Sequence, residues 1–237
     1  MTIIRDCIAP DRNPKVPGIK LPEGSIDTHV HIFESQYPLF EGRGYNPPDS
    51  TLDDLKHLHS QLGVSRVVYT QPSPYGVDNS AILKGMKVMN DETPGRARGV
   101  CAITMDVTDN FLEDLDNQGI KGVRLNMDNI GGMPIGLDEI PSLEARIKGL
   151  GWHVEYLFPG KDIVELAPIF KKSSVPISIA HFAYQPATNG IDSEGFKTLL
   201  DLVRDGNTWI KISGANRVSA TDLPPYDDVM PMARALI

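Results

Sequence analysis

The stretch SRVVYTQ, residues 65–71, carries apolar side chains on successive positions instead of on alternate ones. The stretch VPISIAHF, residues 175–182, has the same character further along the chain. A strand with this pattern is buried on both faces, as in parallel sheets that helices cover on both sides. These two stretches therefore indicate an α/β protein built on a parallel sheet.

Short β-rich runs and helical patterns alternate along the rest of the chain. The expected strands are Ser25–Phe33, Arg66–Gln71, Arg98–Met105, Gly122–Asn126, His153–Phe158, Pro176–Ala180 and Trp209–Ser213. The expected helices are Leu52–Leu62, Asn79–Asn90, Asn110–Gln118, Leu143–Leu150, Ile163–Lys172, Ser193–Arg204 and Tyr226–Ile237. Seven βα units fit either an open doubly wound sheet or a (β/α)8 TIM barrel that lacks its eighth βα unit. We expect this body to span residues 25–237, after an extended, proline-rich arm over residues 1–24.

The composition bounds the class of protein. With 237 residues, 41% of them hydrophobic and 23% charged, the chain can bury a sizeable core and is not dominated by disorder. A net charge of −8 excludes a broad nucleic-acid surface, and no apolar run is long enough to span a membrane. Cys7 and Cys101 form neither a disulfide framework nor a metal-binding pair, which favours a reducing, cytoplasmic setting.

The first expected strand, SIDTHVHIF, places His29 and His31 two residues apart. Side chains alternate along a strand, so both imidazoles point to the same face. At the carboxyl end of a first strand, such a pair can form half of a metal site or an acid–base pair. Two core histidines held by hydrogen bonds are the alternative interpretation.

The remaining histidines have different settings. His181 follows an apolar strand and would project at its carboxyl end, whereas His153 begins a strand and is interpreted as a hydrogen-bonded core residue. His57 and His59 have the spacing of the first pair but fall in a helical segment, where residues two apart do not share a face. We expect both of these to lie on the surface.

Two arginines and one turn add polar groups near the strand ends. Arg124 lies inside an apolar strand, where it is either paired in a salt bridge or bidentate on a substrate carboxylate. Arg217, after the seventh strand, has the same two interpretations. The turn after the second strand is expected to supply three polar side chains to the same mouth: Ser73, Tyr75 and Asn79. Motifs of serine hydrolases, P-loop nucleotide-binding proteins and dinucleotide-binding enzymes are absent from the sequence.

Taken together, these pieces resemble the amidohydrolase superfamily. Within it they are similar to the amidohydrolase-2 branch, which holds 2-pyrone-4,6-dicarboxylate lactonase and related sugar-lactone and muconolactone hydrolases. The motifs that carry the resemblance are DTHVHIF (27–33), QPSPYGVDNS (71–80), GVRLN (122–126), GWHVEYLF (151–158), HFA (181–183) and KISGANRVS (211–219).

The resemblance implies a (β/α)8 barrel whose site lies at the carboxyl face of the strands. It implies attack of water on an activated carbonyl of a small carboxylated lactone. The catalytic residues would be His29, His31 and His181, which would also be the ligands of one divalent ion, Zn or Mn, if a metal is bound. The substrate would be held by Tyr45, Ser73, Arg124 and Arg217. The resemblance implies no nucleic-acid or membrane partner, and an oligomer is possible.

Several positions depart from the pattern of the family. Ala180 stands where an aspartate usually precedes the histidine, Leu157 occupies the mouth of the fifth strand, and Ile130 lies near the place of a second arginine. The absence of the second arginine favours a substrate with one anionic group, and no lysine suited to a binuclear site stands at the ends of strands four or five. The chain also ends inside its last expected helix, before the eighth strand and the catalytic aspartate that the family places there. A catalytically impaired, truncated relative and a decarboxylase or hydratase of the same superfamily therefore remain alternatives.

Overall fold

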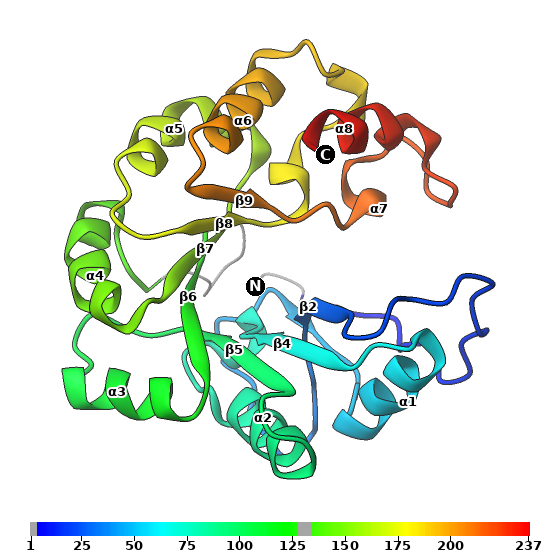
Figure 1. Ribbon diagram of the computed structural model, residues 1–237, viewed down its shortest axis with the longest axis vertical. Coiled ribbons are helices and arrows are strands. Elements are labelled where there is room, and N and C mark those ends of the chain that lie inside the picture. Colours follow the sequence, from blue (N-terminus) through cyan, green and yellow to red (C-terminus); the bar gives the residue numbers. More distant parts are fainter. Residues whose placement is uncertain (1–3, 128–133) are drawn as a thin grey trace. The chain divides into compact units, whose positions relative to one another are not determined.

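A computed structural model describes residues 4–127 and 134–237, so Ile130 lies outside the described residues. Its main sheet has seven strands that follow one another in sequence order (Figure 1). They are β2 (Ile26–Val30), β4 (Arg66–Thr70), β5 (Ala97–Cys101), β6 (Ile120–Asn126), β7 (His153–Leu157), β8 (Ile177–Ile179) and β9 (Thr208–Ile210). A doubly wound sheet reverses its strand order at a switch point. This order does not reverse, so the expected TIM-barrel-like fold, with seven βα units in the described residues, is confirmed.

Helices separate the strands, as expected. They are α1 (Leu52–Leu62), α2 (Ser80–Glu92), α3 (Asp109–Asn117), α4 (Ile140–Ile147), α5 (Ile163–Lys171), α6 (Glu194–Arg204), α7 (Ala215–Val218) and α8 (Met230–Leu236). In α1 the Thr51 side chain accepts the N–H of Asp54 while the Asp54 carboxylate accepts the N–H of Thr51. Gly63 ends the helix with a φ of 76°. This capping box and left-handed cap explain why α1 has the bounds that the sequence predicts.

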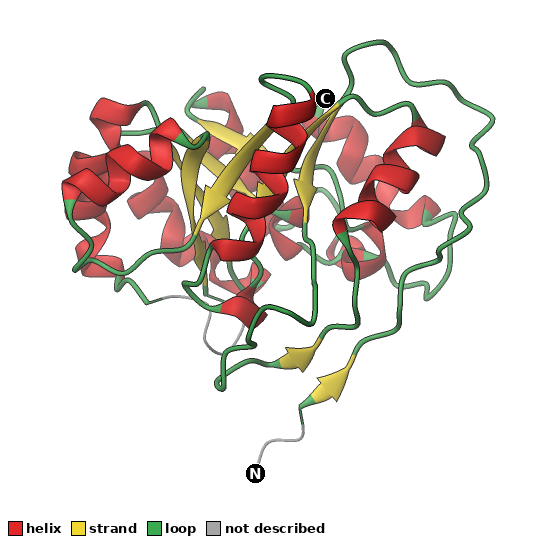
Figure 2. Cartoon of the chain, turned by 90° about the horizontal axis from the view of Figure 1, so that it is seen from below, coloured by secondary structure: helices red, strands yellow, loops and turns green. Residues whose placement is uncertain are grey.

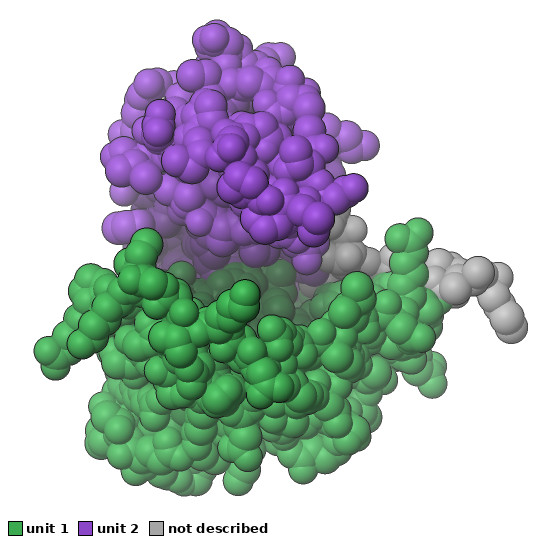
Figure 3. Space-filling view, turned by 90° about the vertical axis from the view of Figure 1, so that its right-hand side faces the viewer, with its two compact units in different colours: residues 1–124, 129–134 green, residues 125–128, 135–237 purple. Residues whose placement is uncertain are grey.

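The chain forms two compact units (Figure 3). Unit 1 holds the described residues up to Arg124 together with Pro134, and unit 2 holds residues 125–127 and 135–237. Each unit has its own apolar core. Met86, Met89 and Tyr69 are fully buried in unit 1, while Trp152 and Phe196 are fully buried in unit 2. Among the described residues, no helix has both the length and the apolar character needed to cross a membrane.

The N-terminal segment is tied to unit 1 at two places. Two short strands that the sequence analysis did not predict, β1 (Arg5–Asp6) and β3 (Tyr45–Asn46), pair in parallel outside the main sheet (Figure 2). Further along, the Arg12 guanidinium forms an ion pair with the Asp54 carboxylate, and its Nη2 donates a hydrogen bond of 3.0 Å to the carbonyl of Asp49. The arm therefore lies on the surface but is held at both ends of its first half.

Strand β9 stands at the end of the strand order. Within residues 4–127 and 134–237, β8 is its only paired neighbour. Trp209 in β9 is 70% exposed and Ile212 just beyond it is 43% exposed. Both line a pocket of about 320 Å³ together with Val203 and Leu236. This edge of unit 2 is thus apolar as well as unpaired in the described chain.

Close packing in unit 1 depends on a missing side chain at Gly99. A Cβ atom at this position of β5 would lie 2.5 Å from Sδ of Met86 and 2.6 Å from Cδ1 of Ile120. Both distances are below van der Waals contact, and both neighbours are buried. An added Cβ at residue 99 would therefore require the ends of the Met86 and Ile120 side chains to shift within the core.

Replacing Gly99 with alanine should overpack this contact and lower the free energy of unfolding by about 1–3 kcal/mol. Urea denaturation measures the change. Gly149→Ala is the control, because an added Cβ there meets nothing within 4 Å. Equal unfolding midpoints for the two variants would show that the α2–β5 contact relaxes without cost.

Candidate active site

His29 and His31 face each other at the carboxyl end of β2. Their Nε2 atoms lie 3.3 Å apart and their ring centroids 4.9 Å apart. Nδ1 of His31 lies 2.8 Å from the carbonyl oxygen of Thr70, at the end of β4. Because a carbonyl can only accept, Nδ1 of His31 carries the hydrogen and Nε2 of the neutral ring carries the lone pair. The close approach of the two rings agrees with the strand pattern, which places both imidazoles on the same face of β2. The hydrogen bond to Thr70 fixes the tautomer of His31.

The separation of the two Nε2 atoms fits a shared metal ion. Two nitrogen ligands at 2.0–2.1 Å from a tetrahedral zinc ion are about 3.3–3.4 Å apart. The observed 3.3 Å agrees with this geometry. In the part of the chain that the structure describes, no group of three or more His, Cys, Asp or Glu residues is placed to hold a metal.

A pair between half-buried Asp27 and buried His59 lies beside the histidines and explains how β2 presents them. Between Asp27 and Val30, β2 has three residue steps where β4 has two, which is a β-bulge. Oδ1 of Asp27 accepts the backbone N–H of His29 at 3.2 Å, and Oδ2 lies 3.2 Å from Nε2 of His59. The Asp27 carboxylate thus joins the bulge to helix α1.

The expectation that both helical histidines are exposed was wrong for His59. His57 is exposed, but His59 is only 2% exposed and faces Asp27. The reason is the helix register, because His59 lies four residues after the buried Leu55 and shares its face. The spacing of Leu55, His59 and Leu62 carried this information in the sequence.

Arg124 lies in β6 and is 6% exposed. Its Nη1 donates a hydrogen bond of 2.8 Å to the carbonyl oxygen of Gln71, one residue beyond β4. Two successive backbone carbonyl groups therefore hold the two side chains: that of Thr70 holds His31, and that of Gln71 holds Arg124.

Two of the three polar side chains of the turn after β4 form hydrogen bonds to the backbone of neighbouring segments. Ser73 begins a short 3-10 helix (Ser73–Tyr75) and is 8% exposed. The Tyr75 hydroxyl accepts the N–H of Glu34 at 2.9 Å, and burial raises the pKa of this phenol. Asn79 is bound to both backbone groups of Ala102. Tyr75 and Asn79 therefore hold the turn in place, and the expectation that they line the mouth was wrong.

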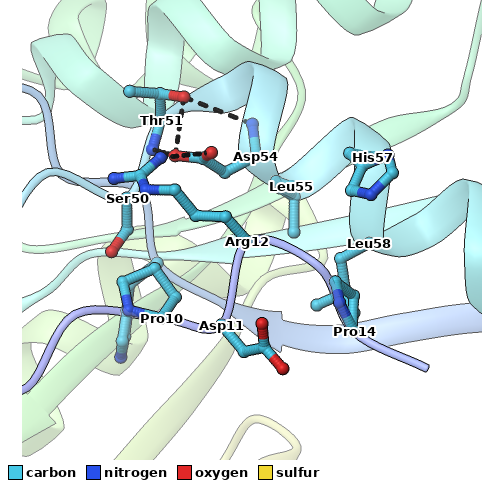
Figure 4. Close-up of a pocket in the computed structure, with 11 residues that line it drawn as sticks. Pro10, Asp11, Arg12, Pro14, Ser50, Thr51, Asp54, Leu55, His57 and Leu58 are labelled. Atoms are coloured by element: carbon cyan, nitrogen blue, oxygen red, sulfur yellow. Dashed lines mark hydrogen bonds and ion pairs between the residues drawn. The ribbon is translucent and has the colours of Figure 1, made fainter.

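A pocket of about 230 Å³ opens beside His31 (Figure 4). The N-terminal arm lines one wall with Pro10, Arg12 and Pro14, and the start of α1 lines the other. Figure 4 shows the Arg12 side chain crossing to Asp54 within this wall. Tyr45 does not line the pocket and is half-buried in β3.

Unit 2 carries the other predicted site residues. His181 lies two residues beyond the end of β8, and its Nδ1 lies 3.0 Å from Oγ of Ser213. Arg217 is exposed on α7, and His153 is half-buried at the start of β7. Leu157 is 3% exposed at the end of β7, so no polar group stands at this position.

The sequence analysis missed two groups in unit 2. Glu155 on β7 is fully buried and forms an ion pair with Nζ of Lys211, which follows β9. The second group is Ser213, which has no sequence feature that separates it from other serines in loops. A charged residue inside the apolar run HVEYLF was the available sign for Glu155, because a buried carboxylate needs a partner.

Sequence and structure comparisons agree on the family. Residues 26–237 match the Amidohydro_2 family, described as amidohydrolases. Because this match covers most of the chain, the chain belongs to this family.

Two named hydrolases and one solved structure are similar to this chain over most of its length. The 2-pyrone-4,6-dicarboxylate hydrolase of Comamonas testosteroni is 33% identical over 235 residues, which are 95% of this chain and 76% of the relative. The 4-sulfomuconolactone hydrolase of Hydrogenophaga intermedia is 33% identical over 236 residues, which are 98% of this chain and 76% of the relative. The crystal structure of an Agrobacterium tumefaciens protein without ligand superposes with a TM-score of 0.82 at 27% identity, over 93% of this chain and 79% of that one.

Removing the carboxylate of Asp27 should destabilise unit 1. Asp27→Ala leaves the buried His59 ring without this partner and should lower the free energy of unfolding by about 1–3 kcal/mol. Asp53→Ala on the exposed side of α1 removes the same charge and serves as the control. Thermal or urea unfolding compares the two, and a loss no larger than that of Asp53→Ala would contradict the role of Asp27.

Proposed function

We propose that the chain opens the lactone ring of a small carboxylated substrate by attack of water on the lactone carbonyl. Two relatives with 33% identity bear the names of hydrolases that act on such anionic ring compounds. The observation that carries the proposal is the His29–His31 pair, in which Thr70 fixes the lone pair of His31 on Nε2. An imidazole in this state accepts a proton from water or binds a metal ion.

The basic residues divide into two roles in this proposal. Arg124, anchored through Nη1 on Gln71, and the exposed Arg217 would bind the substrate carboxylate, with Ser73 and Tyr45 as further contacts. His29, His31 and His181 would exchange protons with water and the ring oxygen. A guanidinium in a site with few competing waters binds a carboxylate through two parallel hydrogen bonds. If both guanidiniums bind the same carboxylate, they suit a substrate with a single anionic group near the lactone.

His29 and His31 would be two ligands of a divalent ion such as Zn or Mn. Such an ion supplies a polarised carbonyl oxygen and a bound water of lowered pKa. The fit of the 3.3 Å Nε2 separation to a tetrahedral site supports this assignment. We further propose a cytoplasmic location, because both cysteines, exposed Cys7 and buried Cys101, are free thiols.

A panel of carboxylated lactones tests the reaction. The purified chain is assayed for ring opening after chelation and again after addition of Zn²⁺ or Mn²⁺. Ring opening without release of carbon dioxide is the expected result and separates a lactonase from a decarboxylase. Absence of turnover for every lactone in every condition would overturn the proposal.

Arg124→Lys should raise the KM for a carboxylated lactone about 10- to 100-fold, because a lysine keeps the charge but loses the bidentate geometry. The matched control is Arg98→Lys on the neighbouring strand β5, whose guanidinium is exposed. Steady-state kinetics on folded variants, checked by circular dichroism, give the comparison. A KM shared by both variants would remove Arg124 from substrate binding.

A further inference from the structure

The residues after β8 adopt a left-handed backbone conformation. His181, Phe182, Ala183 and Tyr184 have φ values of 50°, 54°, 52° and 49°, and none of them is a glycine. Left-handed conformation is disfavoured for residues other than glycine, because the Cβ atom comes too close to the following carbonyl oxygen. Four consecutive residues keep it only if the surrounding contacts hold them, and strain of this kind gathers at functional sites.

Two neighbouring segments of unit 2 hold this turn. The N–H of Phe182 donates to the carbonyl oxygen of Lys211 at 3.0 Å, and the Gln185 side chain donates to the carbonyl of Gly160 at 2.6 Å. Phe182 and Ala183 are buried at 3% and 1% exposure. His181 is therefore carried by a rigid turn whose position depends on the chain that follows β9.

The same segment after β9 contacts the His181 ring directly. Oγ of Ser213 lies 3.0 Å from Nδ1 of His181. At Gly214, which has a φ of 68°, an added Cβ would lie 3.0–3.2 Å from Nδ1, Cγ and Cβ of His181. Ser213 and Gly214 thus form a close-fitting cradle for one edge of the imidazole.

The cradle is itself anchored. Lys211, two residues before Ser213, pairs through Nζ with Glu155 of β7, whose side chain is fully buried. The backbone N–H of Lys211 also donates to the carbonyl oxygen of Ile179 at 2.9 Å. One residue therefore ties the segment to both β7 and β8, and Ser213 has little freedom to move away from the ring.

We propose that Ser213 is the positioning residue of His181. Its hydroxyl accepts the hydrogen on Nδ1, so that Nε2 carries the lone pair used as a base or as a metal ligand. Residue 180, directly before the histidine, is an alanine and offers no carboxylate for this task. A hydroxyl can accept this hydrogen as a carboxylate would, but without adding a negative charge beside the ring. The role in catalysis rests on the proposed function, whereas the tautomer does not.

Nuclear magnetic resonance on the chain labelled with ¹⁵N-histidine tests the tautomer without any substrate. Six histidines are present, and a His181→Gln variant assigns the signals of His181. We expect Nδ1 protonated and Nε2 bare in the wild-type chain. Ser213→Ala should give a mixture of tautomers, whereas Ser213→Thr, which keeps the hydroxyl, should preserve the wild-type pattern.

Kinetics give the second readout. Ser213→Ala should lower kcat about 10- to 100-fold with little change in KM, and Ser213→Thr should restore most of the rate. The control is Ser219→Ala, which removes a hydroxyl bound to Asp228 in the same segment and should leave the His181 signals and kcat unchanged.

The outcomes separate the two proposals. If Nε2 is protonated in the wild-type chain, or if Ser213→Ala leaves the signals of His181 unaltered, the assignment of Ser213 is overturned. The wild-type and Ser213→Thr spectra decide this even if the alanine variant does not fold. If the tautomer is as expected but no lactone is opened, the positioning role stands and the proposed reaction fails.

Discussion

The hydrogen bond between Nδ1 of His31 and the carbonyl oxygen of Thr70 determines the chemistry that unit 1 can perform. Parallel strands end with carbonyl groups that the sheet no longer uses, and such groups accept hydrogen bonds but cannot donate them. At the end of β4, the carbonyl of Thr70 binds His31 and the next carbonyl binds Arg124. Both side chains are thus oriented by the main chain. Their positions follow from the register of the strands, and a change in other side chains would not release them.

Helices and strands were predictable where the local sequence signals agree with the way each element packs in the fold. Helix α1 matches its expected bounds because Thr51, Asp54 and Gly63 mark both ends with side chains and a backbone conformation that only a helix end requires. Strands β6, β7 and β8 were located because nearly all of their residues are buried. Strands β1 and β3 were missed because two residues are too short to show any periodicity, and their pairing joins positions 40 residues apart. The burial of His59 was missed because spacing within a helix was judged without the position of Leu55.

The sequence indicates candidate site residues but not the geometry in which they lie. The histidines and Arg124 stand out because polar side chains are unusual at the ends of apolar strands. Ser213 has the composition of any loop, and its importance comes only from its 3.0 Å approach to His181. The left-handed turn from His181 to Tyr184 contradicts the local preferences of its residues, which are not glycines or asparagines. Tertiary contacts with Lys211 and Gly160 impose it, so no local pattern could have indicated it.

The exposed edge at β9 has a consequence for how the chain behaves at high concentration. Within residues 4–127 and 134–237, β9 pairs with β8 alone, and its other edge, beside exposed Trp209 and Ile212, is a template for another strand. The net charge of −8 keeps copies of the chain apart in dilute buffer. At physiological ionic strength this repulsion is screened beyond about 8 Å. Added salt should therefore shorten the storage life of the chain, because electrostatic repulsion is what opposes edge-to-edge association.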